Sequence, residues 1–145
     1  MLRPIRIYNR LLLTRLGRGM REIKFRGIRE KTGEWVYGYL VMREEPFLHD
    51  IVSPIGNQSS CTWAIKRGSE GQYTGQYDPT ATEFCEGDII KDHTDYWEVK
   101  FFDGAFWIVA IGGNAEPELL CGNDYMEIIS NRFENPELLK EEPTC

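Results

Sequence analysis

The chain has few histidines and cysteines, and it lacks the residue spacings on which common catalytic and metal sites depend. Its two histidines are His49 and His93, and none of its four cysteines forms a C-x-x-C pair of the kind that binds zinc. The nucleophile-elbow pattern G-x-S-x-G does not occur. Gly112 and Gly113 lack the lysine and the helix that a phosphate-binding loop requires. We therefore expect no catalytic residues, no metal, no cofactor and no small-molecule ligand.

Long apolar runs are also missing. The leader, residues 1–19, has five arginines, no acidic residue and an apolar run of only three leucines. A signal peptide needs an apolar run of about 7–15 residues, and a membrane-spanning helix needs about 20. We therefore expect a cytoplasmic protein with reduced cysteines and no membrane segment. The leader is a basic arm, a flexible tail, or an over-extended start with Met20 as the first residue, and the strand-like pattern beginning at Arg21 favours the last.

Charge is divided unevenly along the chain, although the net charge is only −6. Residues 1–31 contain ten basic and two acidic residues, whereas the rest contain seven basic and twenty-one acidic ones. The two parts carry net charges of +8 and −14. This asymmetry is typical of a basic segment that binds an anionic partner or docks onto an acidic neighbour, and a solvated basic tail remains the alternative.

The first strong strand signal is a pair of alternating segments, REIKFRGI and EWVYGYLVM, joined by a turn at residues 31–33. In the second segment, alternate residues fall on opposite faces of a strand, and both faces are apolar, as in a strand covered on both sides. One face carries Trp35, Tyr37, Tyr39 and Val41, and the other carries Val36, Gly38, Leu40 and Met42.

A second hairpin is predicted around Asp103-Gly104, the strongest two-residue hairpin signal, in which both turn residues have positive φ. This turn sets Phe102 opposite Ala105, and counting outward places one fully apolar set on a single face. That set consists of the pairs Phe101 with Phe106, Val99 with Ile108, and Trp97 with Ala110. The other face pairs Lys100 with Trp107 and Glu98 with Val109, and we expect it to be the more exposed one.

The remaining segments are less regular. Pro, Gly, Asn and Ser separate short apolar pieces over residues 43–82, which predicts one or two short strands and a long connection. A last strand is expected at residues 125–130, completing a small closed or nearly closed sheet of SH3-like size. The segment NPELLK predicts a helical turn with Asn135 as N-cap and Pro136 at the first position, and PELL at 117–120 predicts another.

Several of these segments together carry a resemblance to a known family. MREIKFRGIREKTGEWVYGYL, GQYTG, EGDIIK, a W-E-V-K-F strand and EIISNRFENPELL follow one another in the order seen in the YopX family of phage and prophage proteins, which the chain resembles from Met20 to about Lys140. Residues 76–85 depart from the lysine- and glycine-rich turn expected there.

The resemblance implies an all-β chain encoded by a bacteriophage or prophage. It implies an irregular N-terminal β-subdomain over residues 20–82, a small C-terminal SH3-like barrel over 83–140, a short C-terminal helical turn, and a tail over 141–145. The family supplies no established enzymatic activity, so the resemblance carries over no catalytic residues.

An acidic cluster around His93 offers the main enzymatic alternative. Carboxylates and a histidine are suited to a divalent metal or to acid–base chemistry. Asx residues also favour turns through hydrogen bonds to the backbone, and we prefer that interpretation. The residues concerned are Glu83, Glu86, Asp88, Asp92, His93 and Asp95.

Nucleic-acid binding is a further alternative, because affinity for phosphate depends on Lys and Arg. The barrel region from 83 to 130 has only Lys91 and Lys100, so its exposed aromatics would bind bases weakly. The candidate nucleic-acid or partner surface is instead the first hairpin, with Arg21, Lys24, Arg26, Arg29 and Lys31.

A non-catalytic, self-assembling protein fits the sequence best. A basic hairpin and an acidic body suit a homo-oligomer in which opposite charges set the register. The apolar centre of such a contact would come from Tyr37 and its aromatic neighbours or from the outer face of the second hairpin, with Lys100, Trp107 and Glu98. The alternative is that these aromatics pack between the two subdomains.

Overall fold

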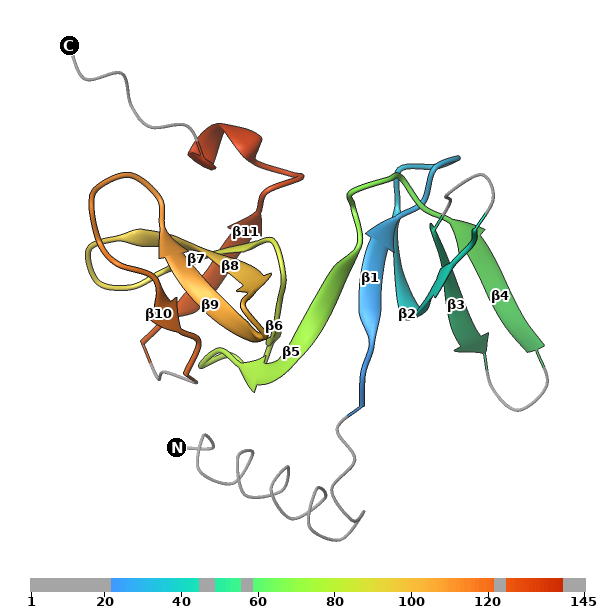
Figure 1. Cartoon of the computed structure of the whole chain (residues 1–145), viewed down its shortest axis with the longest axis horizontal. Coiled ribbons are helices and arrows are strands. Elements are labelled where there is room, and N and C mark those ends of the chain that lie inside the picture. Colours follow the sequence, from blue (N-terminus) through green and yellow to red (C-terminus); the bar gives the residue numbers. More distant parts are fainter. Residues whose placement is uncertain (1–21, 45–48, 56–58, 122–124, 140–145) are drawn as a thin grey trace, which may run out of the picture. The chain divides into compact units, whose positions relative to one another are not determined.

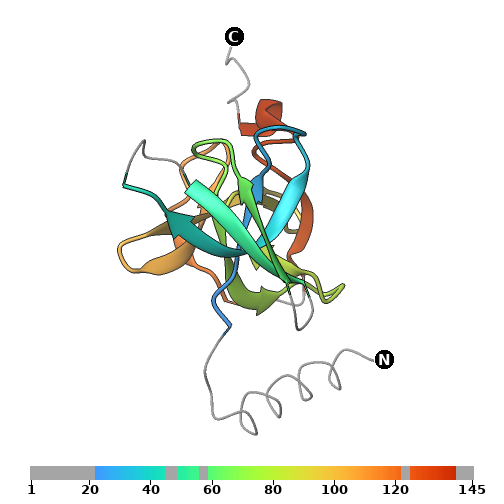
Figure 2. The ribbon, with the colours of Figure 1, turned by 90° about the vertical axis from the view of Figure 1, so that its right-hand side faces the viewer.

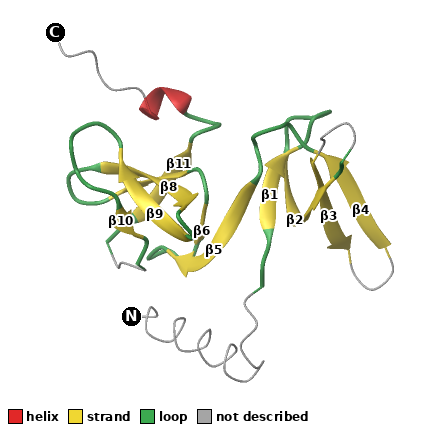
Figure 3. Cartoon of the chain, viewed as in Figure 1, coloured by secondary structure: helices red, strands yellow, loops and turns green. Residues whose placement is uncertain are grey.

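The computed structural model describes residues 22–44, 49–55, 59–121 and 125–139. Arg21, the leader and the expected start at Met20 lie outside these residues. The described chain is almost entirely β-structure (Figures 1 and 3), which confirms the predicted fold class. The first strands are β1 (Phe25–Ile28), β2 (Trp35–Met42), β3 (His49–Ile55), β4 (Ser59–Ala64) and β5 (Gly71–Tyr77). The others are β6 (Glu83–Cys85), β7 (Asp88–Lys91), β8 (Tyr96–Phe102), β9 (Ala105–Ala110), β10 (Glu118–Leu119) and β11 (Glu127–Asn131), followed by the 3₁₀ turn η1 (Pro136–Leu139).

The chain divides into two compact units. The N-terminal unit spans Ile23–Tyr73, and the C-terminal unit contains the chain from Thr74 onward. The division therefore falls inside β5, whereas the sequence analysis placed the subdomain boundary between residues 82 and 83.

The N-terminal unit is built on a strand that changes partner. The first half of β2 pairs with β1, ending at the pair Phe25↔Gly38, and its second half pairs with β3, beginning at Tyr39↔Val52. At the change, the two backbones approach so closely that a Cβ on Gly38 would lie 2.2 Å from the carbonyl oxygen of Val52. Gly38 also has a φ of +154°, which side-chain-bearing residues rarely adopt.

This unit curls back on itself, because the end of β4 returns to the end of β1. An isolated bridge joins Arg29 to Ile65. On either side of it, the amide of Glu30 donates to the carbonyl of Ala64 at 2.9 Å, and the amide of Lys66 donates to that of Ile28 at 2.8 Å. The four strands, in the order β4-β3-β2-β1, therefore curl around a small core (Figure 2). This core consists of Val36, Ile51 and Ile65, with Phe25, Leu40 and Trp63 packed against them.

The expectation that β2 is covered on both faces is wrong. Val36 and Leu40 face the core, but on the other face Tyr37 is 51 % exposed, Tyr39 49 % and Val41 42 %. Met42, on the same face as Val36 and Leu40, is also exposed, because it lies at the end of the strand. The curl of the sheet explains the difference, because β1 to β4 close around one side of β2 and leave its other side outward.

The C-terminal unit is a five-stranded antiparallel sheet in the order β10-β9-β8-β7-β11. The predicted hairpin register is confirmed at every pair, from Phe102↔Ala105 to Trp97↔Ala110. Asp103 has φ 50° and Gly104 has φ 76°, as a type I′ turn requires. Among the described residues no pairing joins the edge strands β10 and β11, so we describe this sheet as open. Its core contains Phe84, Ile90, Trp97, Val99, Ile108, Leu120 and Met126.

Two residues of this hairpin differ from expectation. Phe101, predicted on the apolar and less exposed face of the hairpin, is 47 % exposed, because β7 pairs with β8 only as far as Glu98 and the hairpin extends beyond it. Glu98, predicted on the outer face, is only 3 % exposed. It lies in the middle strand of the sheet, between its partners Ile89 and Val109, where side chains cover both faces.

The two PELL segments adopt different structures. At 136–139 the predicted helical turn forms as η1. At 117–120 the predicted helical turn is wrong, because Glu118 and Leu119 form β10 instead. The free edge of β9 accounts for this, since β10 pairs Leu119 with Trp107 and the Leu120 amide donates to the carbonyl of Phe106 at 3.0 Å.

We expect Gly38→Ala to destabilise the N-terminal unit much more than Gly33→Ala. Gly33 also has positive φ, but a Cβ there meets nothing within 4 Å, so its loss is about 1 kcal/mol. At Gly38 the clash with the Val52 backbone adds about 1–3 kcal/mol. Urea unfolding of both variants measures the difference, and equal losses would contradict the close approach of β2 and β3.

Candidate binding surfaces

Within the acidic cluster around His93, Asp92 stabilises a turn. Its Oδ1 accepts hydrogen bonds from the amides of Thr94 at 2.9 Å and Asp95 at 2.7 Å. Its Oδ2 accepts one from the indole N–H of Trp97 at 3.0 Å. These hydrogen bonds hold the pKa of Asp92 below its ordinary value of 3.8, with the largest effect from the Thr94 amide and the next from the Asp95 amide. The Trp97 indole and the nearby His93 also lower the pKa, and burial opposes them.

Three other members of the cluster, Asp88, Glu83 and His93, make contacts at different places in the fold. Asp88 is buried and accepts a hydrogen bond from the Cys85 amide at 2.7 Å, within the turn between β6 and β7. Glu83 accepts one from the hydroxyl of Tyr77 at 2.6 Å. The ring of His93 stacks on that of Tyr125, with centroids 5.5 Å apart. Within the described residues, no three His, Cys, Asp or Glu side chains gather as a metal site would require.

The basic residues of the first hairpin separate into two groups. Lys24 and Arg26 each lie over an aromatic ring of the N-terminal unit. The ammonium of Lys24 lies 4.8 Å from the ring centroid of Tyr73, and the guanidinium of Arg26 lies 4.7 Å from that of Trp35. Arg29 and Lys31 lie instead at the turn, where the Arg29 amide donates to the carbonyl of Glu34.

We call the exposed row Tyr37, Tyr39 and Val41 the sheet patch. Alternate residues of one strand share a face, so these three side chains stand in a line along β2. Arg26 is the cross-strand partner of Tyr37 and stands on the same face. The ring of Tyr73 lies 6.4 Å from that of Tyr37. The structure thus places two of the predicted basic residues, Lys24 and Arg26, on the same surface as the predicted aromatic residue Tyr37.

We call Phe102, Trp107 and Leu119 the hairpin patch. Phe102 is 40 % exposed and Leu119 54 %, and Leu119 is the cross-strand partner of Trp107. The rings of Phe102 and Trp107 are stacked at 5.3 Å, and the indole N–H of Trp107 donates to the carbonyl of Phe102 at 2.9 Å. Lys100 is exposed beside them, as expected, but the buried Glu98 cannot belong to this surface.

The sequence analysis missed Phe102 and Leu119. The hairpin register alone places Phe102 on the same face as Lys100 and Trp107, so that signal was available. Leu119 had no such signal, because its exposure depends on β10 being a strand at the edge of the sheet rather than a helical turn.

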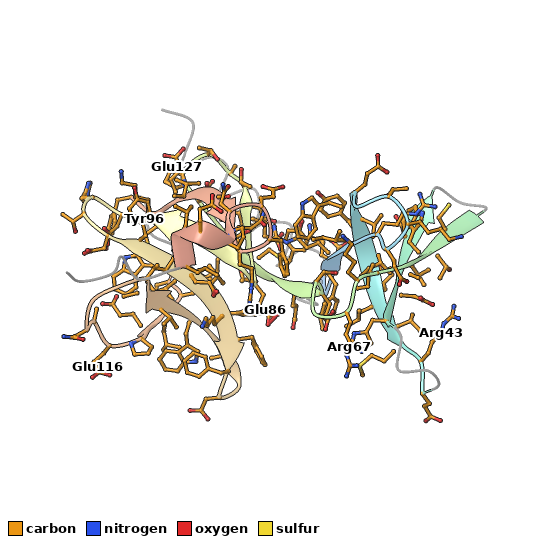
Figure 4. The ribbon with its side chains drawn as sticks, turned by 90° about the horizontal axis from the view of Figure 1, so that it is seen from above. Arg43, Arg67, Glu86, Tyr96, Glu116 and Glu127 are labelled. Atoms are coloured by element: carbon orange, nitrogen blue, oxygen red, sulfur yellow. The ribbon has the colours of Figure 1, made fainter. Side chains whose placement is uncertain are left out.

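The two units differ sharply in charge. Residues 23–73 contain seven basic and six acidic residues, a net charge of +1, and residues 74–145 contain four basic and sixteen acidic residues, a net charge of −12. Figure 4 labels Arg43 and Arg67 in the first and Glu86, Glu116 and Glu127 in the second. The sheet patch therefore belongs to a nearly neutral unit with cations beside it, and the hairpin patch lies within the strongly acidic residues 74–145.

These features define an all-β protein of two compact units, each with an exposed aromatic patch. A profile of the YopX protein family matches residues 24–140, so the chain belongs to the YopX family. The crystal structure of protein EF1440 from Enterococcus faecalis is similar, with a TM-score of 0.51 and 19 % identity over 83 % of this chain and all of that one. That likeness concerns the fold alone. The comparison with curated proteins found no match.

Within the described ranges, no helix is both long enough and apolar enough to cross a bilayer.

We expect the Asp92 carboxylate to contribute stability that depends on pH. Because its pKa is lowered in the folded state, this contribution is present above the ordinary value of 3.8 and is lost as pH falls below it. Asp92→Asn should therefore be less stable than the wild type near pH 6, and the difference should shrink as pH falls through 3.8 toward the lowered value. Urea unfolding at several pH values checks this.

Glu116→Gln is the control for this prediction, because it removes one exposed carboxylate outside the turn. A stability difference between Asp92→Asn and the wild type that stays constant between pH 6 and pH 3 would contradict the role given to the carboxylate charge.

Proposed function

We propose that the protein acts by binding rather than catalysis, as a phage or prophage accessory protein that assembles with copies of itself. The observation that carries this proposal is the sheet patch, in which two half-exposed tyrosines and a valine stand in a row on a folded sheet. Tyrosine is enriched at the centres of protein interfaces, because it offers a large contact area with few rotatable bonds. A sheet surface also holds the rings in place before contact, which lowers the entropic cost of association.

The charge distribution supports self-association, in which the partner is a second copy of the chain. Each copy contains an acidic segment, residues 74–145, of net charge −12, and a nearly neutral unit in which Lys24 and Arg26 stand beside the sheet patch. Complementary charges raise the association rate and disfavour wrong orientations. Such attraction weakens as salt rises, because the Debye length falls from about 10 Å at 0.1 M to about 3 Å at 1 M.

The first test is self-association of the wild type over a micromolar concentration series, followed by sedimentation velocity. Tyr37→Ser with Tyr39→Ser should weaken association roughly a hundredfold, since loss of an interface tyrosine typically costs more than about 1 kcal/mol. Tyr125→Ser is the matched control, because Tyr125 is as exposed but lies in the C-terminal unit, outside both patches. A wild type that stays monomeric throughout the series removes the assembly proposal.

Nucleic-acid binding is the second candidate, and one observation favours it. Lys24 over Tyr73 and Arg26 over Trp35 alternate cations with aromatic rings on the same sheet face as Tyr37. Sheet aromatics that stack on bases, with basic side chains on the phosphates, are a common way to bind single strands. The net charge of −6 opposes it, because long-range repulsion lowers affinity for a polyanion.

A gel shift with a single-stranded oligonucleotide at two salt concentrations tests this candidate. Two phosphate contacts, from Lys24 and Arg26, predict a slope of log K against log salt of roughly −1.4. Replacing both residues with alanine should abolish the shift, whereas Lys66→Ala, an exposed cation in the same unit, should leave it unchanged. Binding that does not respond to salt or to these substitutions would exclude this surface.

A further inference from the structure

We propose that a second contact between copies forms through β4, with the β4 strands of two copies pairing antiparallel about a two-fold axis. This inference goes beyond the association proposed above, because the contact lies on the edge of the N-terminal sheet and does not use the sheet patch. It rests on the backbone of β4, on the lack of the features that usually protect such an edge, and on the sequence of the β3–β4 hairpin.

The free edge of β4 presents backbone groups that can pair with another strand. In an antiparallel pair, alternate residues direct their amide and carbonyl toward the partner strand. The Ile65 amide donates to the carbonyl of His49 at 3.1 Å, so alternate residues back to Cys61 turn toward β3. Thr62 and Ser60 turn away from β3, and within the described residues their backbone groups have no hydrogen-bond partner.

The other sheet edges of the described chain are protected by different means. β11 has a bulge between Ile128 and Ser130, and the Ile128 amide donates to the carboxylate of the buried Asp78 at 3.3 Å. β6 has only three residues and β10 only two, and the Leu120 carbonyl beyond β10 accepts a hydrogen bond from the Gln76 side chain at 2.7 Å. Bulges, short strands and covered backbone groups all prevent an edge from pairing with another chain.

The edge at β4 has none of these protections. Its six residues pair with β3 in one continuous register without a bulge. Its sequence, Ser-Ser-Cys-Thr-Trp-Ala, contains no proline and no charged residue. Lysine and proline are the residues that usually stop an edge strand from pairing further. An unprotected edge of this kind is the surface on which a further strand adds to a sheet.

The sequence around β4 suits pairing with a second copy of the chain. An antiparallel pair of identical strands is two-fold symmetric, so a charged side chain near the axis would meet its own copy. Residues 51–65 contain no Asp, Glu, Lys, Arg or His, although 28 % of the whole chain is charged. Like charges on the β3–β4 hairpin therefore do not oppose the pairing of two β4 strands.

The free length of the edge determines the register of the pairing. The Glu30 amide donates to the Ala64 carbonyl at 2.9 Å, so the edge is already covered at Ala64. Thr62 of one copy must then pair with Ser60 of the next, and the reverse. Cys61 falls on the axis opposite its own copy, in a non-hydrogen-bonded pair with Cα atoms about 4.5 Å apart. A disulfide needs Cα atoms about 4.4–6.8 Å apart, so Cys61 can report on this contact.

This pairing leaves the sheet patch free. Tyr39, Val52 and Thr62 lie opposite one another on β2, β3 and β4, so they share one face of the sheet. The two-fold axis runs through that face, and both copies therefore present their sheet patches on the same side of the joined sheet. A dimer formed through β4 still offers both patches for the association proposed above.

Disulfide trapping tests the register. A variant with Cys121→Ser and Cys145→Ser keeps only Cys61 and the buried Cys85. Diamide, the added oxidant, takes up the two hydrogens of two thiols as the S–S bond forms. We expect a covalent dimer joined through Cys61, identified by mass spectrometry of unreduced peptides, and its loss when Cys61→Ser is added. A folded, purified protein that gives no such dimer would overturn the inference and leave an extended segment of a different protein as the occupant of this edge.

Thr62→Pro tests the backbone hydrogen bonds. Proline is tolerated on an edge strand where the amide faces solvent, as the Thr62 amide does, so the variant should fold. Without that amide, the yield of the Cys61 dimer should fall roughly tenfold or more. Thr62→Val is the matched control, because it keeps the amide and the branched side chain, and it should cross-link like the parent protein.

Circular dichroism and urea unfolding establish whether the proline variant is folded. If it does not fold, Thr62→Lys takes its place, because the Thr62 side chain is exposed and an edge lysine blocks further pairing. Cross-linking through Cys61 that persists undiminished in a folded Thr62→Pro or Thr62→Lys protein would show that the two β4 strands do not pair.

The outcomes separate this contact from the proposed function. Tyr37→Ser with Tyr39→Ser should keep the Cys61 cross-link, because both tyrosines lie on β2, two strands from β4. If these substitutions weaken association and Cys61 does not cross-link, the sheet patch stands and the pairing of β4 is wrong. If Cys61 cross-links and the tyrosine substitutions change nothing, the pairing of β4 stands and the role of the sheet patch is wrong. A monomeric wild type contradicts both.

Discussion

The two-residue turn at Asp103 and Gly104 is the constraint on which the C-terminal unit depends. Both residues have positive φ, and this geometry allows the flanking strands only one register. Because side chains alternate along a strand, that register sends Trp97, Val99 and Ile108 inward together and Phe102 and Trp107 to the opposite face. One local turn therefore determines both the core and the exposed surface of this unit.

Gly38 has the corresponding role in the N-terminal unit. The absence of a side chain lets β2 pass from β1 to β3 at a backbone distance that no other residue allows. The sheet then curls around Val36, Ile51 and Ile65, and the outer side of β2 stays exposed. The exposed tyrosines are thus a geometric consequence of how this small core closes.

Local chemistry made some features predictable from the sequence, and long-range contacts hid others. The Asp103-Gly104 register and the Asx turn at Asp92 depend on neighbouring residues only, and both were recognised. The burial of Glu98, the exposure of Phe101 and the strand at Glu118 depend on where other strands begin and end. The joint placement of Arg26 and Tyr37 required the register of β1 with β2, which REIKFRGI alone does not specify.

Exposed aromatic rows on small β-proteins carry a risk of indiscriminate association. In this chain the hairpin patch lies within residues 74–145, whose net charge of −12 opposes the approach of a second such surface. The sheet patch has Arg26 and Lys24 beside it, and each lies over an aromatic ring of a unit that is nearly neutral. The acidic charge of residues 74–145 therefore limits association between hairpin patches, while the stacked rings of Phe102 and Trp107 keep this patch ordered.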